Sequence, residues 1–251
     1  METENLVNME NINKSFGSID ALKNANFILK KGEIVGLAGD NGAGKSTLVK
    51  ILAGVFPYDS GRILLDGKNV KLNSPKDAIK HGIESIYQDL ALFEDMNLIR
   101  NIFIGRELIK KNFGGFFKTL NIDKMREETL NALKMTKINI KDINALVHTL
   151  SGGQRQSVAV ARAVYFRAKV VIMDEPTAAL SVKEVNKILD LAKELRDEGI
   201  GVIIITHNLH HMFSVADRIT VLQNGSQVGD KKITETDIRE IENLIIGKEV
   251  G

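Results

Sequence analysis

Short apolar runs alternate along the chain with stretches whose apolar residues recur at helical spacing. The runs at 34–38, 170–173 and 202–205 contain no charged residue, which is typical of strands that are buried on both faces of a sheet. Leu48 is followed by Ile51 and Leu52 at the spacing of one helical face. This alternation predicts an α/β fold with a mainly parallel sheet.

Two dipeptides indicate antiparallel pieces in the same fold. Asp66-Gly67 and Asn224-Gly225 each separate two strand-like runs, and such pairs favour the tight turns of β-hairpins. The sheet is therefore expected to be mixed, with an antiparallel β region near the N-terminus. The stretch from Asp89 to Leu150 lacks comparable strand runs, so it is interpreted as a mainly helical insertion.

The composition narrows the class of protein. Of 251 residues, 43% are hydrophobic and 26% are charged, which is ordinary for a globular protein and argues against disorder, collagen and coiled coil. The net charge of +2 neither indicates nor excludes a nucleic-acid or membrane-binding surface. The absence of cysteine rules out disulfide and thiolate chemistry. The longest apolar runs are far shorter than the ~20 residues that cross a bilayer, and the N-terminal segment has no export-signal pattern, so we expect a soluble chain.

A glycine-rich stretch follows the first buried run and carries a phosphate-binding pattern. Gly39 is followed by four residues and then by Gly44, Lys45 and Ser46, which is the P-loop pattern in its strand and helix context. Its backbone amides and the N-terminus of the next helix favour phosphate. Lys45 is expected to reach the β and γ phosphates, and the Ser46 hydroxyl to bind Mg²⁺. The alternative is a flexible turn before an ordinary helix. The predicted ATP-binding loop comprises Gly39, Asp40, Asn41, Gly42, Ala43, Gly44, Lys45, Ser46 and Thr47.

A second buried run delivers two acidic residues. The run at 170–173 leads into Asp174 and Glu175, at the carboxyl end of a predicted strand, where ligands bind in such sheets. Asp174 is expected to hold Mg²⁺. Glu175 would point the other way in a strand, which suits it to orient or deprotonate the attacking water. The alternative is a solvated turn before Pro176.

The segment LSGGQRQ at 150–156 predicts an unusual helix start. Ser151 and Gln154 have the spacing of a capping box, and this alone would only start a helix. Helix capping alone does not require Gly152 and Gly153. Because these residues lack side chains, they expose the first-turn amides to an anion. We interpret this helix start as a second phosphate-seeking surface that serves the nucleotide of another molecule.

LSGGQRQ, the P-loop and VVIMDEPT at 170–177 together resemble the nucleotide-binding domain of ABC transporters. The resemblance covers nearly the whole chain and implies one ATPase domain over 1–251. Its nucleotide-binding core would comprise 1–88 and 160–251, and its helical subdomain 89–159. It implies that two copies face head to tail with two ATP molecules between them, each gripped by Ser151, Gly152, Gly153 and Gln154 of the other copy.

The resemblance assigns roles to further positions. Phe16 resembles the aromatic residue that stacks on adenine, with a core side chain as the alternative. Gln88 resembles the glutamine that touches Mg²⁺ and the attacking water, and His207 the histidine that contacts the γ-phosphate and positions Glu175. The chain departs from the family at Ser181, where an aspartate is common, and this puts in doubt only the coupling between the two ATP sites.

His207 has a rival interpretation as a metal ligand. With His210 and His211 it forms HNLHH, whose spacing places imidazoles on one helical face. No carboxylate or cysteine nearby completes the ligand shell.

Longer stretches are similar to the ATPases of bacterial monosaccharide importers of the ribose, fructose and xylose type. They are GDNGAGKSTL, YQDLALFEDMNLIRNIFIGRE, DEPTAALSVKE and THNLHHMFSVADRITVL. The resemblance implies a homodimer at the cytoplasmic side of the membrane that drives separate permease subunits and, indirectly, a sugar-binding protein. Phe113, Phe116 and Phe117 are candidates for a permease-binding groove or for the core of the insertion. Alternatives are importer ATPases for another solute, soluble ATPases that act on nucleic acid or ribosomes, and a regulator that binds nucleotide without turnover. Under the favoured interpretation, nucleic acid is not expected among the partners of the chain.

Overall fold

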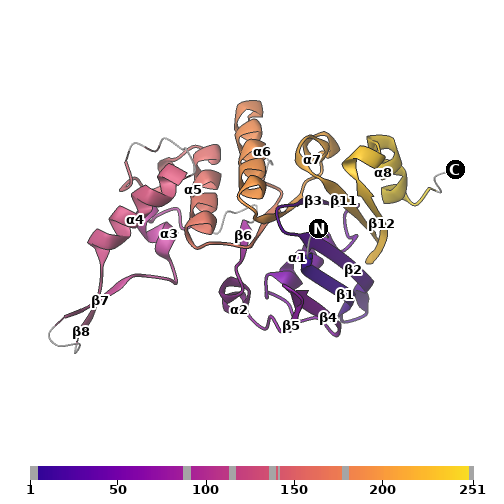
Figure 1. Ribbon diagram of the computed structural model, residues 1–251, viewed down its shortest axis with the longest axis horizontal. Coiled ribbons are helices and arrows are strands. Elements are labelled where there is room, and N and C mark those ends of the chain that lie inside the picture. The colour runs from indigo at the N-terminus through magenta and orange to yellow at the C-terminus, as the bar shows by residue number, and fades with distance from the viewer. Residues whose placement is uncertain are drawn as a thin grey trace. The chain divides into compact units, whose positions relative to one another are not determined.

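The computed structural model describes residues 5–86, 92–112, 117–135, 140, 142–176 and 181–248. Within these residues the chain forms two compact units (Figure 1). The first unit comprises 5–86, 168–176 and 189–248, and the second comprises 92–112, 117–135, 140, 142–167 and 181–188. In this part of the chain, no helix is both long and apolar enough to span a membrane.

A six-stranded sheet forms the centre of the first unit, with strand order β12-β11-β3-β10-β9-β6. Five of its strands run parallel, and only β12 pairs antiparallel, with β11 at one edge. The predicted α/β class, with a mixed and mainly parallel sheet, is confirmed, and the three apolar runs are the central strands β3, β9 and β10. The strands are β3 Ile34–Ala38, β6 Ile83–Ile86, β9 Val170–Asp174, β10 Gly201–Ile205, β11 Arg218–Gln223 and β12 Ser226–Lys232.

A four-stranded antiparallel sheet forms the rest of the β structure of this unit, in the order β2-β1-β4-β5. Both predicted hairpin turns are present. Asp66 and Gly67 connect β4 to β5 with φ of 47° and 73°, and Asn224 and Gly225 connect β11 to β12 with φ of 48° and 82°. The strands are β1 Asn5–Phe16, β2 Ile19–Lys30, β4 Ser60–Leu65 and β5 Lys68–Val70.

The helices of the first unit begin at polar caps. The Ser74 hydroxyl accepts a hydrogen bond from the Asp77 amide at the start of α2, and Asn208 and Asp237 cap α7 and α8 in the same way; such caps satisfy N–H groups that the helix leaves unpaired. A continuous apolar core contains side chains of both sheets and of α1. The helices are α1 Lys45–Leu52, α2 Pro75–Lys80, α7 Leu209–Val215, the 3-10 turn Ile233–Glu235, α8 Ile238–Ile246 and the final residues of α6, which spans Val182–Asp197.

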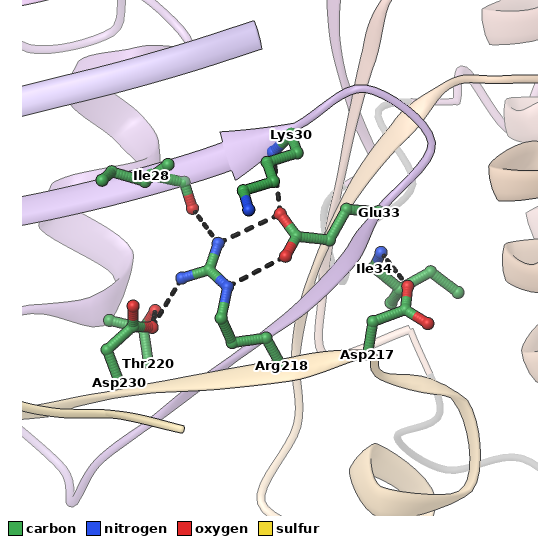
Figure 2. A network of polar contacts seen from close by, with 8 residues as sticks. All are labelled: Ile28, Lys30, Glu33, Ile34, Asp217, Arg218, Thr220 and Asp230. Atoms are coloured by element: carbon green, nitrogen blue, oxygen red, sulfur yellow. Dashed lines mark hydrogen bonds and ion pairs between the residues drawn. The ribbon is translucent and has the colours of Figure 1, made fainter. Parts of the chain in front are cut away.

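A buried arginine ties the two sheets of this unit together (Figure 2). Arg218, in β11, forms two hydrogen bonds to the Glu33 carboxylate at 2.9 and 3.0 Å, one to Asp230 at 2.6 Å and one to the Ile28 carbonyl at 2.7 Å. Only 11% of its side chain is exposed. Because Ile28 lies in β2 and Glu33 immediately precedes β3, the network fixes the start of the strand that leads into the glycine-rich loop.

The second unit is mainly helical. Leu98, Phe103, Met125 and Leu133 belong to its own buried core. Asn101 is fully buried and satisfies its amide on the carbonyls of neighbouring residues, as buried polar groups require. The helices are α3 Leu98–Phe103, α4 Ile122–Met135, the 3-10 turn Val147–Thr149, α5 Gly152–Tyr165 and the first residues of α6.

This unit also contains an antiparallel hairpin of β7 Ile109–Asn112 and β8 Phe117–Leu120, within the stretch expected to lack strands. Ile109 and Leu120 are paired across it, and they are 57% and 41% exposed. The pattern of apolar residues does not predict these strands, because a two-stranded ribbon open to solvent does not need the continuous apolar run of a buried strand. Polar residues stand in both strands of this hairpin, namely Lys110, Lys118 and Thr119.

Candidate functional site

The loop between β3 and α1 has the backbone of a phosphate cradle. Gly42 and Gly44 adopt φ of 80° and 101°. These positive values lie in a backbone region that favours glycine. A Cβ at Gly44 would lie 2.7 Å from the carbonyl oxygen of Ala21, whereas one at Gly42 would meet nothing within 4 Å. Gly44 is the N-cap residue of α1, and it offers no side-chain cap. The first-turn amides of α1 therefore have no capping side chain in competition with an anion.

Lys45 is folded into this loop. Only 7% of the residue is exposed, and its Nζ donates to the carbonyls of Gly39 at 2.7 Å and Asp40 at 2.8 Å. Burial lowers the pKa of Lys45, and the negative charges of Glu175, Asp40 and Asp174 oppose that shift. An ammonium group has three donors, so one remains for a phosphate oxygen while the other two bind the loop.

Asp174 is the last residue of β9 and is half-buried. Burial raises the pKa of its carboxyl group, and the nearby charges of Lys50, Lys45 and His207 oppose the shift. The strand therefore places a carboxylate close enough to the P-loop lysine for the two charges to interact.

Glu175 has a strained backbone immediately after this strand. Its φ is 51°, a conformation that costs a residue with a side chain about 1–3 kcal/mol, and its N–H donates to the Ile205 carbonyl at 2.9 Å. The sequence predicted that strand alternation would turn this side chain away from Asp174. The strand ends at Asp174 instead, and the left-handed turn sets the direction of Glu175.

The Glu175 carboxylate lies against His207. Its Oε1 is 3.1 Å from His207 Nε2, and 17% of the Glu175 side chain and 63% of the His207 side chain are exposed. The two side chains form an ion pair when His207 is protonated, and Oε1 is buried and makes no hydrogen bond within the residues described. Burial raises the pKa of Glu175, with the His207 charge as the largest opposing influence. A carboxylate whose pKa is raised by burial and which lies beside a histidine is suited to accept a proton from water.

The donors at this site fit Mg²⁺, which prefers a few oxygen ligands and retains several waters. Asp174 offers a carboxylate, and Ser46, exposed on the first turn of α1, offers a hydroxyl. Gln88, the third expected ligand, lies outside the described residues. Across the described ranges, no three His, Cys, Asp or Glu side chains are grouped closely enough to form a metal cage. The alternative of a metal site at His207, His210 and His211 therefore finds no support.

Phe16 ends β1 and is 43% exposed. Its ring packs edge to face with Phe56, with the centroids 5.2 Å apart, and the Nζ of Lys14 lies 5.3 Å from its centroid. The alternative of a core side chain is therefore wrong. An aromatic ring with an exposed surface remains available for a planar ligand.

The predicted helix start in the second unit has both bonds of a capping box. The Ser151 hydroxyl accepts from the Gln154 amide at 3.3 Å, and the Gln154 side chain accepts from the Ser151 amide at 3.0 Å. Gly152 and Gly153 form the first turn of α5. Ser181 precedes α6, and its carbonyl accepts from Val185 at 2.9 Å. Phe117 lies in β8, whereas Phe113 and Phe116 lie outside the described residues.

Sequence reasoning overlooked Lys50. This residue, in the last turn of α1, interacts electrostatically with Asp174, and its Nζ lies 5.8 Å from the centre of the Phe56 ring. The sequence feature that could have indicated this role is the position of Lys50 as a second lysine on the helix predicted to follow the P-loop.

Comparison with protein families and known sequences gives a consistent result. The family model described as ABC transporter matches residues 22–178. The chain is 50% identical over 246 residues to the xylose/arabinose import ATP-binding protein XylG of Sulfolobus acidocaldarius, covering 98% of this chain and 96% of that protein. It is 43% identical to the fructose import ATP-binding protein FrcA of Rhizobium meliloti, covering 91% and 88%. It is 40% identical to the ribose import ATP-binding protein RbsA of Chromobacterium violaceum, where it covers 98% of this chain but only 48% of that longer protein.

Solved structures are similar over nearly the same length. A nucleotide-free ATP-binding cassette from an ABC transporter superposes with a TM-score of 0.81 at 27% identity, covering 96% of this chain and 95% of that one. A dimeric post-hydrolysis state of the cassette MJ0796, bound to ADP and Pi, superposes with a TM-score of 0.74 at 28% identity, covering 90% and 98%.

Proposed function

Because the chain belongs to the ABC transporter family, we propose that it hydrolyses ATP to power the import of a sugar through a separate membrane permease. Three relatives described as sugar-import ATP-binding proteins support the sugar assignment, and the xylose/arabinose protein matches over nearly its full length. In this proposal residues 1–251 act as one ATPase domain. Its core is 1–88 and 160–251, and its helical subdomain is 89–159.

The pairing of Glu175 with His207 beside Lys45 is the observation that carries the proposal. The loop amides of 39–47 and the Lys45 ammonium hold the β and γ phosphates, and Phe16 stacks on adenine. When bound by Ser46, Gln88 and Asp174, Mg²⁺ supplies positive charge to the phosphate oxygens.

Glu175 accepts the proton of the attacking water on its carboxylate. The water oxygen then bonds to the γ-phosphorus as the bond to the ADP oxygen breaks, which releases ADP and phosphate. His207 fixes the carboxylate through Nε2 and lies near the transferred group. Burial of Glu175 serves this step because a raised pKa makes the carboxylate a stronger base.

A second copy completes each site in this proposal. The amides at the start of α5 and the Ser151 hydroxyl meet the γ-phosphate held by the other copy, with Gly152, Gly153 and Gln154 alongside. Similarity to a cassette solved as a dimer supports the arrangement. ATP between the copies stabilises the closed dimer, and a shift from 1:99 to 99:1 requires about 5.5 kcal/mol of differential binding. Loss of the γ-phosphate removes that difference and opens the dimer.

The cycle does work on the permease subunits, which receive sugar from a sugar-binding protein. The ATPase lies on the cytoplasmic side as a peripheral subunit. The transport assignment is tested in proteoliposomes that contain the matching permease and enclose this protein with ATP, with the matching sugar-binding protein added outside. Uptake of labelled xylose, arabinose, ribose or fructose supports it. ATP-dependent uptake of an unrelated solute with none of these sugars contradicts it.

The hydrolytic assignment is tested with Glu175→Gln and Lys45→Ala. Glu175→Gln is expected to bind ATP with the affinity of the original chain but to lose nearly all turnover, and to accumulate as a dimer with ATP and Mg²⁺. Lys45→Ala is expected to lose most ATP binding. Glu242→Gln, an exposed change on α8, is the matched control and keeps full turnover. Normal turnover in Glu175→Gln rules out the proposed role.

A further inference from the structure

An ion pair contacts the exposed ring of Phe16. The Nζ of Lys14 lies 2.8 Å from Asp59 Oδ1 and 5.3 Å from the centre of the Phe16 ring. Only 11% of the Lys14 side chain is exposed, compared with 47% for Asp59. The ammonium is therefore largely withdrawn from water and is shared between a carboxylate and an aromatic ring, where a cation is stabilised by the π electrons.

Asp59 is itself fixed to the backbone next to Phe16. Its Oδ2 accepts from the Ser15 amide at 2.7 Å, and its own amide donates to the Asn13 carbonyl at 2.8 Å. The hydrogen bond from Lys14, followed by that from Ser15, lowers the pKa of Asp59. The carboxylate therefore stays ionised at neutral pH and holds the ammonium in one place.

Two contacts thus restrain the ring of Phe16. Phe56 packs against it at an interplanar angle of 73°, and the ammonium of Lys14 lies over it. With 43% of Phe16 still exposed, the ring is held by these two contacts yet remains accessible. Ordering a side chain during ligand binding costs conformational entropy, and a ring that is already ordered avoids that cost.

We propose that Lys14 and Asp59 are positioning residues for the base of the nucleotide, which hold Phe16 in the orientation that receives the planar ring of adenine. The inference rests on the proposed stacking role of Phe16 and extends it to two residues assigned no role above. Neither residue acts on the phosphates in this proposal. Their loss should therefore weaken ligands that carry a base and spare ligands that do not.

The test compares ATP with inorganic tripolyphosphate, which has no base. Both are titrated calorimetrically into the full chain with EDTA present, so that no hydrolysis occurs. Phe16→Ala is expected to weaken ATP binding roughly 5- to 150-fold. Lys14→Met, which keeps the apolar stem, should weaken ATP binding roughly threefold to tenfold and leave tripolyphosphate binding unchanged. Asp59→Asn should act in the same direction, and Lys14→Arg should restore most of the affinity.

A double variant and a matched control separate positioning from stability. In the Phe16→Ala background, Lys14→Met should have no further effect on ATP binding. Arg62→Met removes another cation that pairs with a carboxylate on the same sheet, that of Glu10, and should leave ATP binding unchanged. With Mg²⁺, Lys14→Met should raise KM for ATP at unchanged kcat. Far-UV circular dichroism melting curves check that each variant is folded.

The outcomes distinguish this inference from the proposed function. Equal weakening of ATP and tripolyphosphate by Lys14→Met, or its full effect in the absence of Phe16, overturns the positioning role. If Phe16→Ala weakens ATP binding while Lys14→Met and Asp59→Asn do not, the positioning role fails and the stacking role stands. If Phe16→Ala has no effect, both roles fail together.

Discussion

Alanine at Gly44 should destabilise the chain more than alanine at Gly42, although both glycines lie in the same loop. At Gly44, φ is 101° and a Cβ would lie 2.7 Å from the Ala21 carbonyl oxygen and 2.8 Å from Leu22 Cδ2. The backbone conformation costs about 1–3 kcal/mol, and relief of the overlap costs about 1–3 kcal/mol more. At Gly42, φ is 80° and a Cβ meets nothing within 4 Å, so only the conformational cost applies.

The free energy of unfolding measures this difference directly. Urea denaturation of the nucleotide-free chain, followed by far-UV circular dichroism, should show Gly44→Ala less stable than Gly42→Ala by about 1–3 kcal/mol. Because no nucleotide is present, differences in phosphate binding between the two variants do not contribute to the measured free energy of unfolding. Equal loss of stability in the two variants would refute the reasoning. It would mean that the close approach of β2 to Gly44 adds nothing to the cost of a Cβ there.

Three further predictions concern charged side chains. Arg218→Met should lower the free energy of unfolding by about 3–5 kcal/mol, because it leaves Glu33 and Asp230 without their buried partner; a loss below about 1 kcal/mol in urea denaturation would contradict this. Glu175 must be ionised to act as a base and burial raises its pKa, so kcat should fall as the pH decreases through an inflection above the ordinary value of 4.5; phosphate release measured across pH tests this, and a rate that stays flat down to that value counts against it. His207→Ala removes the charge that opposes this shift, so it should lower turnover and move the inflection to higher pH; an unmoved inflection would show that the two side chains do not interact.

Features set by neighbours in the sequence were predictable. The turns at Asp66 and Asn224 follow from dipeptides that tolerate left-handed backbone, and the capping box at Ser151 follows from the spacing of two polar residues. The strands β3, β9 and β10 were predictable because each is a continuous apolar run, which is typical of a strand buried on both faces of a sheet. The glycine-rich loop was identifiable because phosphate binding constrains the residue types at fixed positions.

Features set by distant parts of the chain were not predictable. The left-handed turn at Glu175 depends on a hydrogen bond to the Ile205 carbonyl, which the strand pattern does not reveal. Glu33 and Arg218 are 185 positions apart in the sequence, so nothing local indicates their pairing. The ion pair between Lys14 and Asp59 likewise depends on the pairing of β1 with β4.

The proposal that two copies build each catalytic site is most directly tested by the dependence of ATP turnover on protein concentration. The rate is measured from concentrations at which light scattering finds only monomer up to those at which ATP yields a dimer. The account predicts that turnover per chain approaches zero in the monomer range and rises with the fraction of dimer, and that Ser151→Arg lacks this rise while its monomer still binds ATP. Constant turnover per chain throughout the range, including the monomer, would contradict it.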